Sequence, residues 1–372
     1  MRVPLVDLGP QEASVAAEVL AELAAVASSA QFILGPRVEA FERWLAGACG
    51  AGHAVGVASG TDALELSLRA VGVGPGDAVV TPALSFIAAA EAIANAGARP
   101  VFCDVDAATL NMTAETCAAA LERARRAGLR TKAIVPVHLF GRCVPLRGLV
   151  DLAAEAGVEI VEDAAQALGA RGDGGAPAGA IGAAGCFSFF PTKNLGGWGD
   201  GGAVVTSRAA VAARVRRLRA HGASEPYVHA ELGRNSRLDA LQASVLLAKA
   251  RHLEAWQRAR ARLAAGYLSG LAGLPLALPP DVEPPAVHAW NAFVVRTERR
   301  DALAERLKAR GVESRVYYPV PLHRQPCFAS LAEPPLPVAE EACRAALALP
   351  LFTAMTEAQQ GYVVEQVTGF FR

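Results

Sequence analysis

Two kinds of hydrophobic pattern alternate along the chain between Glu12 and Ser207. Segments with apolar residues at helical spacing are separated by short β-rich runs, namely HAVGVAS, DAVVTP, RPVFCDV, KAIVPVHLF and VEIVEDA. This alternation is typical of an α/β fold with a mainly parallel sheet covered by helices. Because ligands of such sheets bind at the carboxyl ends of the strands, we expect functional residues where these runs end.

The pattern changes in the last third of the chain. From Leu238 to Leu271 apolar residues recur at helical spacing without any proline, which predicts one long helix. The run GLPLALPPDVEPP then interrupts the chain, and AWNAFVV, RRDALAERLKARG and SRVYYPV predict a strand, a helix and another strand. We therefore expect a large α/β domain of residues 1–248 and a smaller α+β domain of residues 249–372.

Composition narrows the class of protein. Apolar residues make up 52% of the 372 residues, and 36 basic residues balance 36 acidic ones, so no net field favours nucleic acid or an anionic membrane. The seven cysteines are scattered, with no CxxC pair and no Cys/His spacing suited to zinc. No apolar signal core opens the chain and no uninterrupted apolar stretch predicts a membrane span. A cytoplasmic enzyme without a metal site is the expectation.

A candidate anion site lies at Ser59-Gly60-Thr61-Asp62, which ends a β-rich run and opens a predicted helix. The first N–H groups of a helix are unpaired and carry the positive end of its dipole, and glycine lets a phosphate approach the backbone. Taken alone, the motif is better explained by Thr61 or Asp62 capping the helix, with Glu65 completing a capping box.

Asp163 ends the apolar run VEIVEDA. A carboxylate at this place can bond a protonated ring nitrogen, and each charge keeps the other group ionised, as a pyridine cofactor requires. Glu162 alternates with Asp163 along the strand and is expected to face the other way. A strand-end aspartate by itself is also common as a cap or a surface charge.

Lys193 lies in GCFSFFPTKNLGGWGDGGAVVT, where two β-rich runs flank a turn rich in glycine. Such a tight loop can direct a side chain inward, and a lysine whose pKa is lowered forms Schiff bases with carbonyl compounds. An isolated loop lysine is usually solvated. Its significance here comes from the order along the chain of an anion site, a strand-end aspartate and a loop lysine.

Six motifs in this chain resemble successive motifs of the DegT/StrS family of sugar-nucleotide aminotransferases, which have the fold-type I pyridoxal-phosphate (PLP) architecture. They are FILGPRVEAFE, GVASGTDAL, EDAAQALGA, FSFFPTKNLGGWGDGGAVVT, GRNSRLDALQA and YYPVPLHRQP, and the resemblance extends from about Val3 to Pro326. Leu168 departs from the pattern, because many relatives have histidine at this position.

The resemblance implies a role for each matching residue. Lys193 would form the Schiff base with PLP and Asp163 would hold the pyridine nitrogen, with Gln166 near the phenolic oxygen. The remaining cofactor contacts would be Phe86 stacking on the ring, Ser59, Gly60, Thr61 and Ser188 at the phosphate, and Asn235 reaching the phosphate of a neighbouring subunit. This last role requires a homodimer with shared active sites. Tyr317, Tyr318 and His323 are the candidates for substrate contact.

The implied reaction moves an amino group from L-glutamate to a keto carbon of a nucleotide-linked deoxysugar. The GRNSRLDALQASVLLAKA and GGWGDGG variants resemble those of family members that aminate C3 more than those of members that act at C4. A PLP-dependent sugar dehydratase is the alternative enzyme, although such members are expected to carry histidine in place of Lys193 or extra cysteines for an iron–sulfur cluster. A PLP-binding regulator is a third possibility. A nicotinamide dehydrogenase is disfavoured because no GxGxxG follows the first β-rich run.

Overall fold

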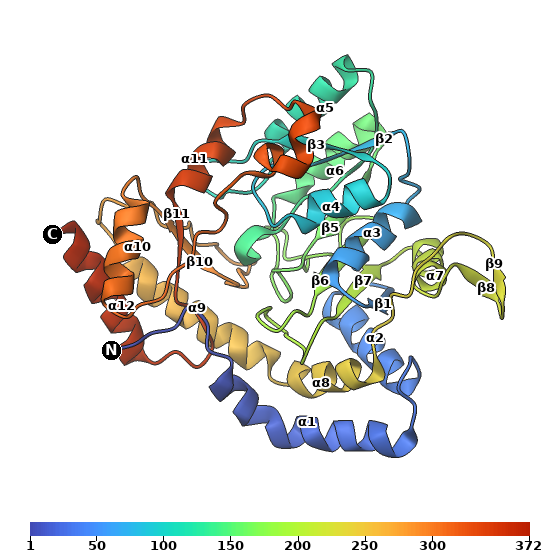
Figure 1. Ribbon diagram of the computed structural model, residues 1–372, viewed down its shortest axis with the longest axis horizontal. Helices are drawn as coiled ribbons and strands as arrows, with labels where there is room; N and C mark the ends of the chain where they lie inside the picture. The colour runs from blue at the N-terminus through green and yellow to red at the C-terminus, as the bar shows by residue number, and fades with distance from the viewer.

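The computed structural model describes residues Met1–Arg372, and a seven-stranded sheet forms the centre of its larger part (Figure 1). The strands lie in the order β1-β7-β6-β5-β4-β2-β3, and only β7 runs antiparallel to its neighbours. Their bounds are β1 His53–Val57, β2 Asp77–Pro82, β3 Arg99–Cys103, β4 Arg130–Ile134, β5 Glu159–Asp163, β6 Ala184–Ser188 and β7 Gly202–Thr206. The predicted α/β architecture with a mainly parallel sheet is confirmed.

Helices cover both faces of this sheet. One face carries α3 (Gly60–Ala70), α4 (Ala88–Asn95) and α7 (Ala209–Leu218), whose apolar residues join those of the strands in one core cluster. The other face carries α2 (Pro36–Ala48), α5 (Ala114–Arg126), α6 (Leu146–Ala156) and α8 (Ala240–Ala250). Because both faces are covered, strands such as β2 and β7 are buried along their whole length, which explains their continuous apolar sequences. The long helix α1 (Gly9–Ser29) packs outside α8.

Part of the C-terminal region packs in a core cluster of its own. The elements of this region are α9 (Leu253–Gly270), β10 (Phe293–Arg296), α10 (Arg300–Ala309), η2 (Leu322–Arg324), η3 (Pro326–Leu331), α11 (Pro337–Ala345), β11 (Ala346–Leu349) and α12 (Glu357–Phe371). Apolar residues of α9, α10, α12 and the antiparallel pair β10–β11 pack in one cluster, and η2, η3 and α11 pack with the core of the larger part. Val3 is buried in the C-terminal cluster, and its backbone bonds to Gly311 and Glu313, so the first residues of the chain lie against the C-terminal part. The boundary between residues 248 and 249 stays a prediction.

Two predicted elements are wrong. The expected long helix is divided into α8 and α9 by a turn at Arg251 and His252. At this turn His252 bonds to Glu18 of α1 at 3.0 Å and stacks on Trp256. The run SRVYYPV forms no strand. Only Arg315 pairs with β11, through Ala348.

Two smaller features complete the fold. A short hairpin of β8 (Ala223–Glu225) and β9 (Val228–His229) projects from the larger part, at the right of Figure 1. The turn η1 (Leu139–Gly141) follows β4 at the edge of the sheet where the parallel strands end. No helix has both the length and the apolar character needed to cross a bilayer.

Candidate active site

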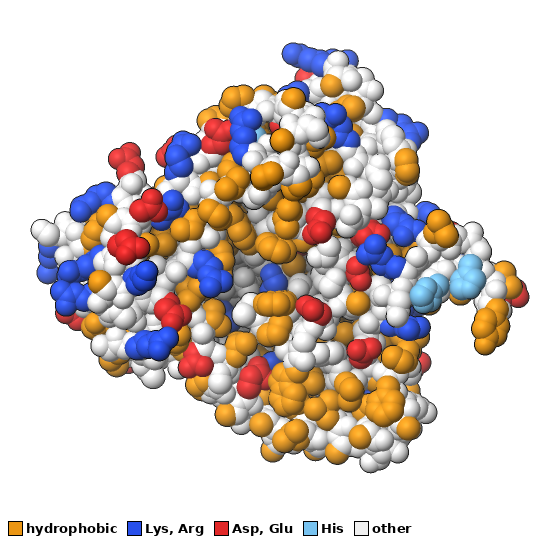
Figure 2. Space-filling model, viewed as in Figure 1, with side chains coloured by type: hydrophobic (Ala, Val, Ile, Leu, Met, Phe, Trp, Pro, Cys, Tyr) orange, Lys and Arg blue, Asp and Glu red, His pale blue; other side chains and the backbone are white.

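A cavity of about 640 Å³ lies where β5 and β6 end, between the sheet and the C-terminal part. Figure 2 shows the molecule hollowed near its centre. The residues predicted from sequence that line it are Ser59, Gly60, Thr61, Phe86, Asp163, Gln166, Ser188, Lys193, Tyr317 and Tyr318. The parallel direction of β1, β5 and β6 explains the convergence, because the carboxyl ends of all three strands meet at one edge.

The start of α3 forms one wall of the cavity. Ser59 is the N-cap, and its Oγ accepts a hydrogen bond from the Asp62 N–H at 3.1 Å, so the expected cap at Thr61 or Asp62 is wrong. Glu65 forms no capping box and pairs instead with Arg69 and Arg234. A Cβ added at Gly60 would lie 2.7 Å from Cβ of Ser188. The glycine therefore lets the helix start approach β6, and the unpaired N–H groups there can bind a phosphate.

Asp163 and Glu162 face opposite sides of β5, as expected. Asp163 lines the cavity, and its Oδ1 accepts a hydrogen bond from the Ala165 N–H at 3.0 Å. Burial raises the pKa of Asp163, although that N–H and Lys193 act in the opposite direction. A buried carboxylate whose pKa is raised has no cation close enough to offset the cost of its burial. A protonated pyridine nitrogen would be such a cation, so the site fits the ring of PLP.

Lys193 enters the cavity from the loop between β6 and β7. Its N–H donates to the Phe190 carbonyl at 2.8 Å, and the adjacent Asn194 donates from Nδ2 to the Ala289 carbonyl at 2.7 Å. These bonds hold the loop against the C-terminal part. Burial lowers the pKa of Lys193, and Asp163 opposes this effect. A lowered pKa increases the neutral fraction of the amine, which is the form that attacks a carbonyl carbon.

Three aromatic or amide side chains complete the walls. Phe86 is 54% exposed and faces Tyr318 with ring centroids 6.3 Å apart, so it is available for stacking and is no part of the core. Gln166 accepts a hydrogen bond from the Phe140 N–H at 2.6 Å and donates to Tyr318 Oη at 3.2 Å. Burial raises the pKa of Tyr318, which keeps its hydroxyl protonated.

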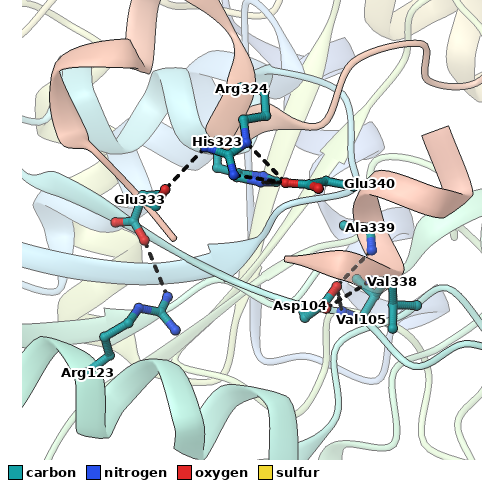
Figure 3. A network of polar contacts seen from close by, with 9 residues as sticks. All are labelled: Asp104, Val105, Arg123, His323, Arg324, Glu333, Val338, Ala339 and Glu340. Carbon is teal, nitrogen blue, oxygen red and sulfur yellow. Dashed lines mark hydrogen bonds and ion pairs between the residues drawn. The ribbon is translucent and has the colours of Figure 1, made fainter. Parts of the chain in front are cut away.

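Two predicted site residues lie outside the cavity. His323 is wholly buried, and its Nε2 lies 2.9 Å from Oε1 of Glu340 in the polar network of Figure 3. The expected substrate contact through His323 is therefore not available in this structure. Asn235 is exposed and pairs by its backbone with Ala220 near the β8–β9 hairpin, outside the cavity.

Sequence reasoning missed other residues at the site. Arg315, Asn291 and Asp200 line the cavity, and Asn194 braces the Lys193 loop. Arg315 could have been found, because it precedes Tyr317 by two positions and an extended segment turns alternate side chains to one side. Asn291 lies on a loop far from the motifs and carries no comparable signal.

A loop lysine, a strand-end carboxylate and a helix start open to an anion, all at one edge of this sheet, define a fold-type I PLP-dependent enzyme. The chain belongs to the DegT/DnrJ/EryC1/StrS aminotransferase family, whose profile matches residues 13–368. It is accordingly an aminotransferase with PLP as its cofactor.

Individual relatives agree with this membership. The chain is 45% identical over 359 residues to the UDP-N-acetyl-3-dehydro-alpha-D-glucosamine 3-aminotransferase of Acidithiobacillus ferrooxidans, covering 96% of this chain and 95% of the relative. It is 42% identical over 377 residues to a pleiotropic regulatory protein of Geobacillus stearothermophilus, covering 100% and 99%. The crystal structure of S. venezuelae DesV in complex with a ketimine intermediate matches with a TM-score of 0.95 and 43% identity, over 100% of this chain and 99% of that one.

Proposed function

We propose that the chain transfers an amino group from L-glutamate to a keto carbon, C3 in preference to C4, of a nucleotide-linked deoxysugar. The observation that carries this proposal is the meeting of Lys193, Asp163 and the start of α3 in one cavity of about 640 Å³, a size suited to a sugar nucleotide. The Acidithiobacillus ferrooxidans relative supports C3, because its name specifies amination at that carbon.

PLP, when bound, supplies an aldehyde that condenses with amines and a ring that withdraws electrons from the adjoining carbon. Lys193 is the amine that would hold this aldehyde in the resting enzyme. Once the amino donor has displaced it, Lys193 Nζ is free to take the proton from the donor's α-carbon. In the second half-reaction Lys193 would return a proton to the sugar carbon that receives nitrogen.

The other residues of the cavity would orient the cofactor and adjust its charge. Asp163 would keep the ring nitrogen protonated, because a buried carboxylate is stabilised by a cation at hydrogen-bonding distance. The Ser59–Thr61 segment and Ser188 would bind the phosphate, and Phe86 would cover one ring face. Gln166 and Tyr318, joined to each other, would contact the phenolic oxygen and the substrate respectively.

A PLP-dependent sugar dehydratase is the alternative activity. It would release a deoxygenated sugar with no transfer of nitrogen. Lys193 favours transamination, because it provides the proton-transfer base that the amino-donor half-reaction needs. Detection of 2-oxoglutarate in step with the amino sugar distinguishes the two reactions.

We propose in addition that two copies form a cytoplasmic dimer with shared active sites. The β8–β9 hairpin projects from the body with Tyr227 97% exposed and Leu232 on the adjoining segment 89% exposed. Figure 2 shows hydrophobic side chains gathered at the lower edge, over α1 and α2. Apolar surface of this kind marks an interaction site.

Sedimentation should give twice the chain mass, and Asn235→Ala should weaken retention of PLP without changing that mass.

The reaction itself is tested by mixing holoenzyme and L-glutamate with 3-keto and 4-keto nucleotide sugars and following product mass and 2-oxoglutarate. Lys193→Ala should abolish transfer and the visible absorption band of a lysine-bound cofactor. Lys132→Ala is the matched control, because Lys132 lies on β4 outside the cavity. Retained transfer in Lys193→Ala, or a deoxygenated product from the wild type, contradicts the proposal.

A further inference from the structure

Five acidic or basic side chains line the cavity: Asp163, Lys193, Asp200, Glu313 and Arg315. Only two of them are cations. The proposed function commits Lys193 to the cofactor, so Arg315 is the single remaining cation on the walls. This matters because both proposed substrates are anions, L-glutamate through its carboxylates and the sugar nucleotide through its diphosphate.

The backbone at Arg315 is firmly held. Its N–H donates to the Ala348 carbonyl at 3.2 Å, and the Ala348 N–H donates to its carbonyl at 2.7 Å. Ala348 and Leu349 of β11 line the same cavity. The side chain of the next residue, Val316, packs against the core cluster of the C-terminal part. Glu313, Arg315 and Tyr317, at alternate positions, all line the cavity, as expected of an extended segment.

The guanidinium of Arg315 has no partner within the chain. No carboxylate lies within 4.0 Å of it, and it makes no side-chain hydrogen bond. The neighbouring Glu313 is engaged elsewhere, since its Oε1 lies 3.3 Å from Arg2 and its Oε2 accepts from the Leu5 N–H at 3.3 Å.

Arg234 and Arg324 already have acidic partners. Arg234 pairs with Asp62 and Glu65 at 2.8 and 2.9 Å. Arg324 pairs with Glu340 at 3.0 Å in the network of Figure 3, outside the cavity. Moving either guanidinium to a substrate would break an ion pair that it now makes. Arg315 can bind an anion without breaking any contact.

We propose that Arg315 is the substrate-anion receptor of this cavity and binds a carboxylate or phosphate oxyanion of the substrates through the planar fork of its guanidinium. The inference rests on the proposed function for the identity of the substrates. An uncommitted guanidinium on a pinned backbone suits this task, because two parallel N–H groups match the two oxygens of a carboxylate or a phosphate. Lysine presents a point charge and cannot reproduce that geometry.

The test measures binding without turnover. Holoenzyme in the PLP form is titrated calorimetrically with 2-oxoglutarate in one arm and with UDP and dTDP in the other. In Arg315→Gln and Arg315→Lys we expect the Kd of at least one probe class to rise about 10- to 100-fold, with Arg315→Lys the milder change. Arg126→Gln, an exposed arginine of α5, is the control and should bind like the wild type.

Each result decides the inference. Weaker 2-oxoglutarate binding alone assigns Arg315 to the donor carboxylate, weaker nucleotide binding alone assigns it to the diphosphate, and weakening of both means that it serves the two substrates in turn. Unchanged affinities in folded Arg315→Gln protein, or a wild type that binds neither probe class, overturn the proposal. Failure of the proposed function is separate, because it would appear as wild-type binding of these probes without amino transfer.

Discussion

The amide of Gln166 donates a hydrogen bond to the hydroxyl of Tyr318 at 3.2 Å, across the cavity that separates the sheet from the C-terminal part. Gln166 is itself oriented by the Phe140 N–H, which donates to its Oε1 at 2.6 Å. Two residues 152 positions apart in the sequence therefore form one unit beside Lys193. The position of the C-terminal part is thereby linked to the place where the chemistry occurs.

Removing this link should reduce catalysis without unfolding the chain. We expect Tyr318→Phe to lower kcat/KM about 5- to 10-fold, equivalent to roughly 1 kcal/mol, because one hydrogen bond is lost and the amide of Gln166 is left without its acceptor. Steady-state kinetics with the keto-sugar substrate measures the change. Tyr362→Phe is the matched control, since that hydroxyl bonds the Arg310 carbonyl at the surface. Equal losses in the two variants would argue against a role for the Gln166–Tyr318 pair.

The start of α3 should be sensitive to a single methyl group. In Gly60→Ala the new Cβ would meet Cβ of Ser188 at 2.7 Å and push the helix start away from β6. We expect a loss of about 1–3 kcal/mol in the free energy of unfolding and roughly tenfold weaker PLP binding. Thermal unfolding and a spectroscopic titration with PLP measure the two effects.

Gly361→Ala on α12 is the control for that variant. An added Cβ there meets nothing within 4 Å, so a small stabilisation of about 0.5–1 kcal/mol is expected from the helix preference for alanine. Wild-type PLP affinity in Gly60→Ala would show that close approach of α3 to Ser188 is unnecessary for phosphate binding.

Glu162 should contribute to stability in a pH-dependent manner. Burial acts to raise the pKa of Glu162, but the hydrogen bond and charge of His138, with the N–H groups of Gly182 and Gly179, outweigh burial and lower the pKa below its usual value of 4.5. The stabilisation is therefore fully present above pH 4.5 and is lost as the pH falls through the lowered pKa. In Glu162→Gln this pH dependence should be lost.

At neutral pH we expect Glu162→Gln to reduce the free energy of unfolding by about 3–5 kcal/mol, because a buried carboxylate with four hydrogen-bond donors is replaced by an amide. Urea unfolding between pH 7 and pH 3 measures both effects. Glu159→Gln removes a partly exposed carboxylate of the same strand that pairs with Arg208, and should cost less than about 1 kcal/mol. A similar small cost for Glu162→Gln would contradict this account.

The sequence predicted which residues converge at the cavity where the chain itself determines the geometry. Asp163 ends a buried strand, Ser59 to Asp62 follow another, and Lys193 lies on a loop between two strands, so their positions follow from local patterns together with the parallel order of the sheet. The expected substrate contact of His323 could not be judged from local sequence. Its motif resembles a substrate contact, but the packing of η2 against α11 directs its imidazole to Glu340 and away from the cavity.

The amino-acid sequence by itself determined the α/β fold, the family and the three residues or segments that meet at one cavity, because apolar periodicity and short motifs are local properties of the chain. Only the tertiary structure decided that the helix after Leu238 breaks at His252, that SRVYYPV forms no strand and that Arg315 has no ionic partner. These outcomes depend on contacts with Glu18, Ala348 and Arg2, which come from distant parts of the chain. Such contacts are made by packing and leave no periodic signal in the sequence.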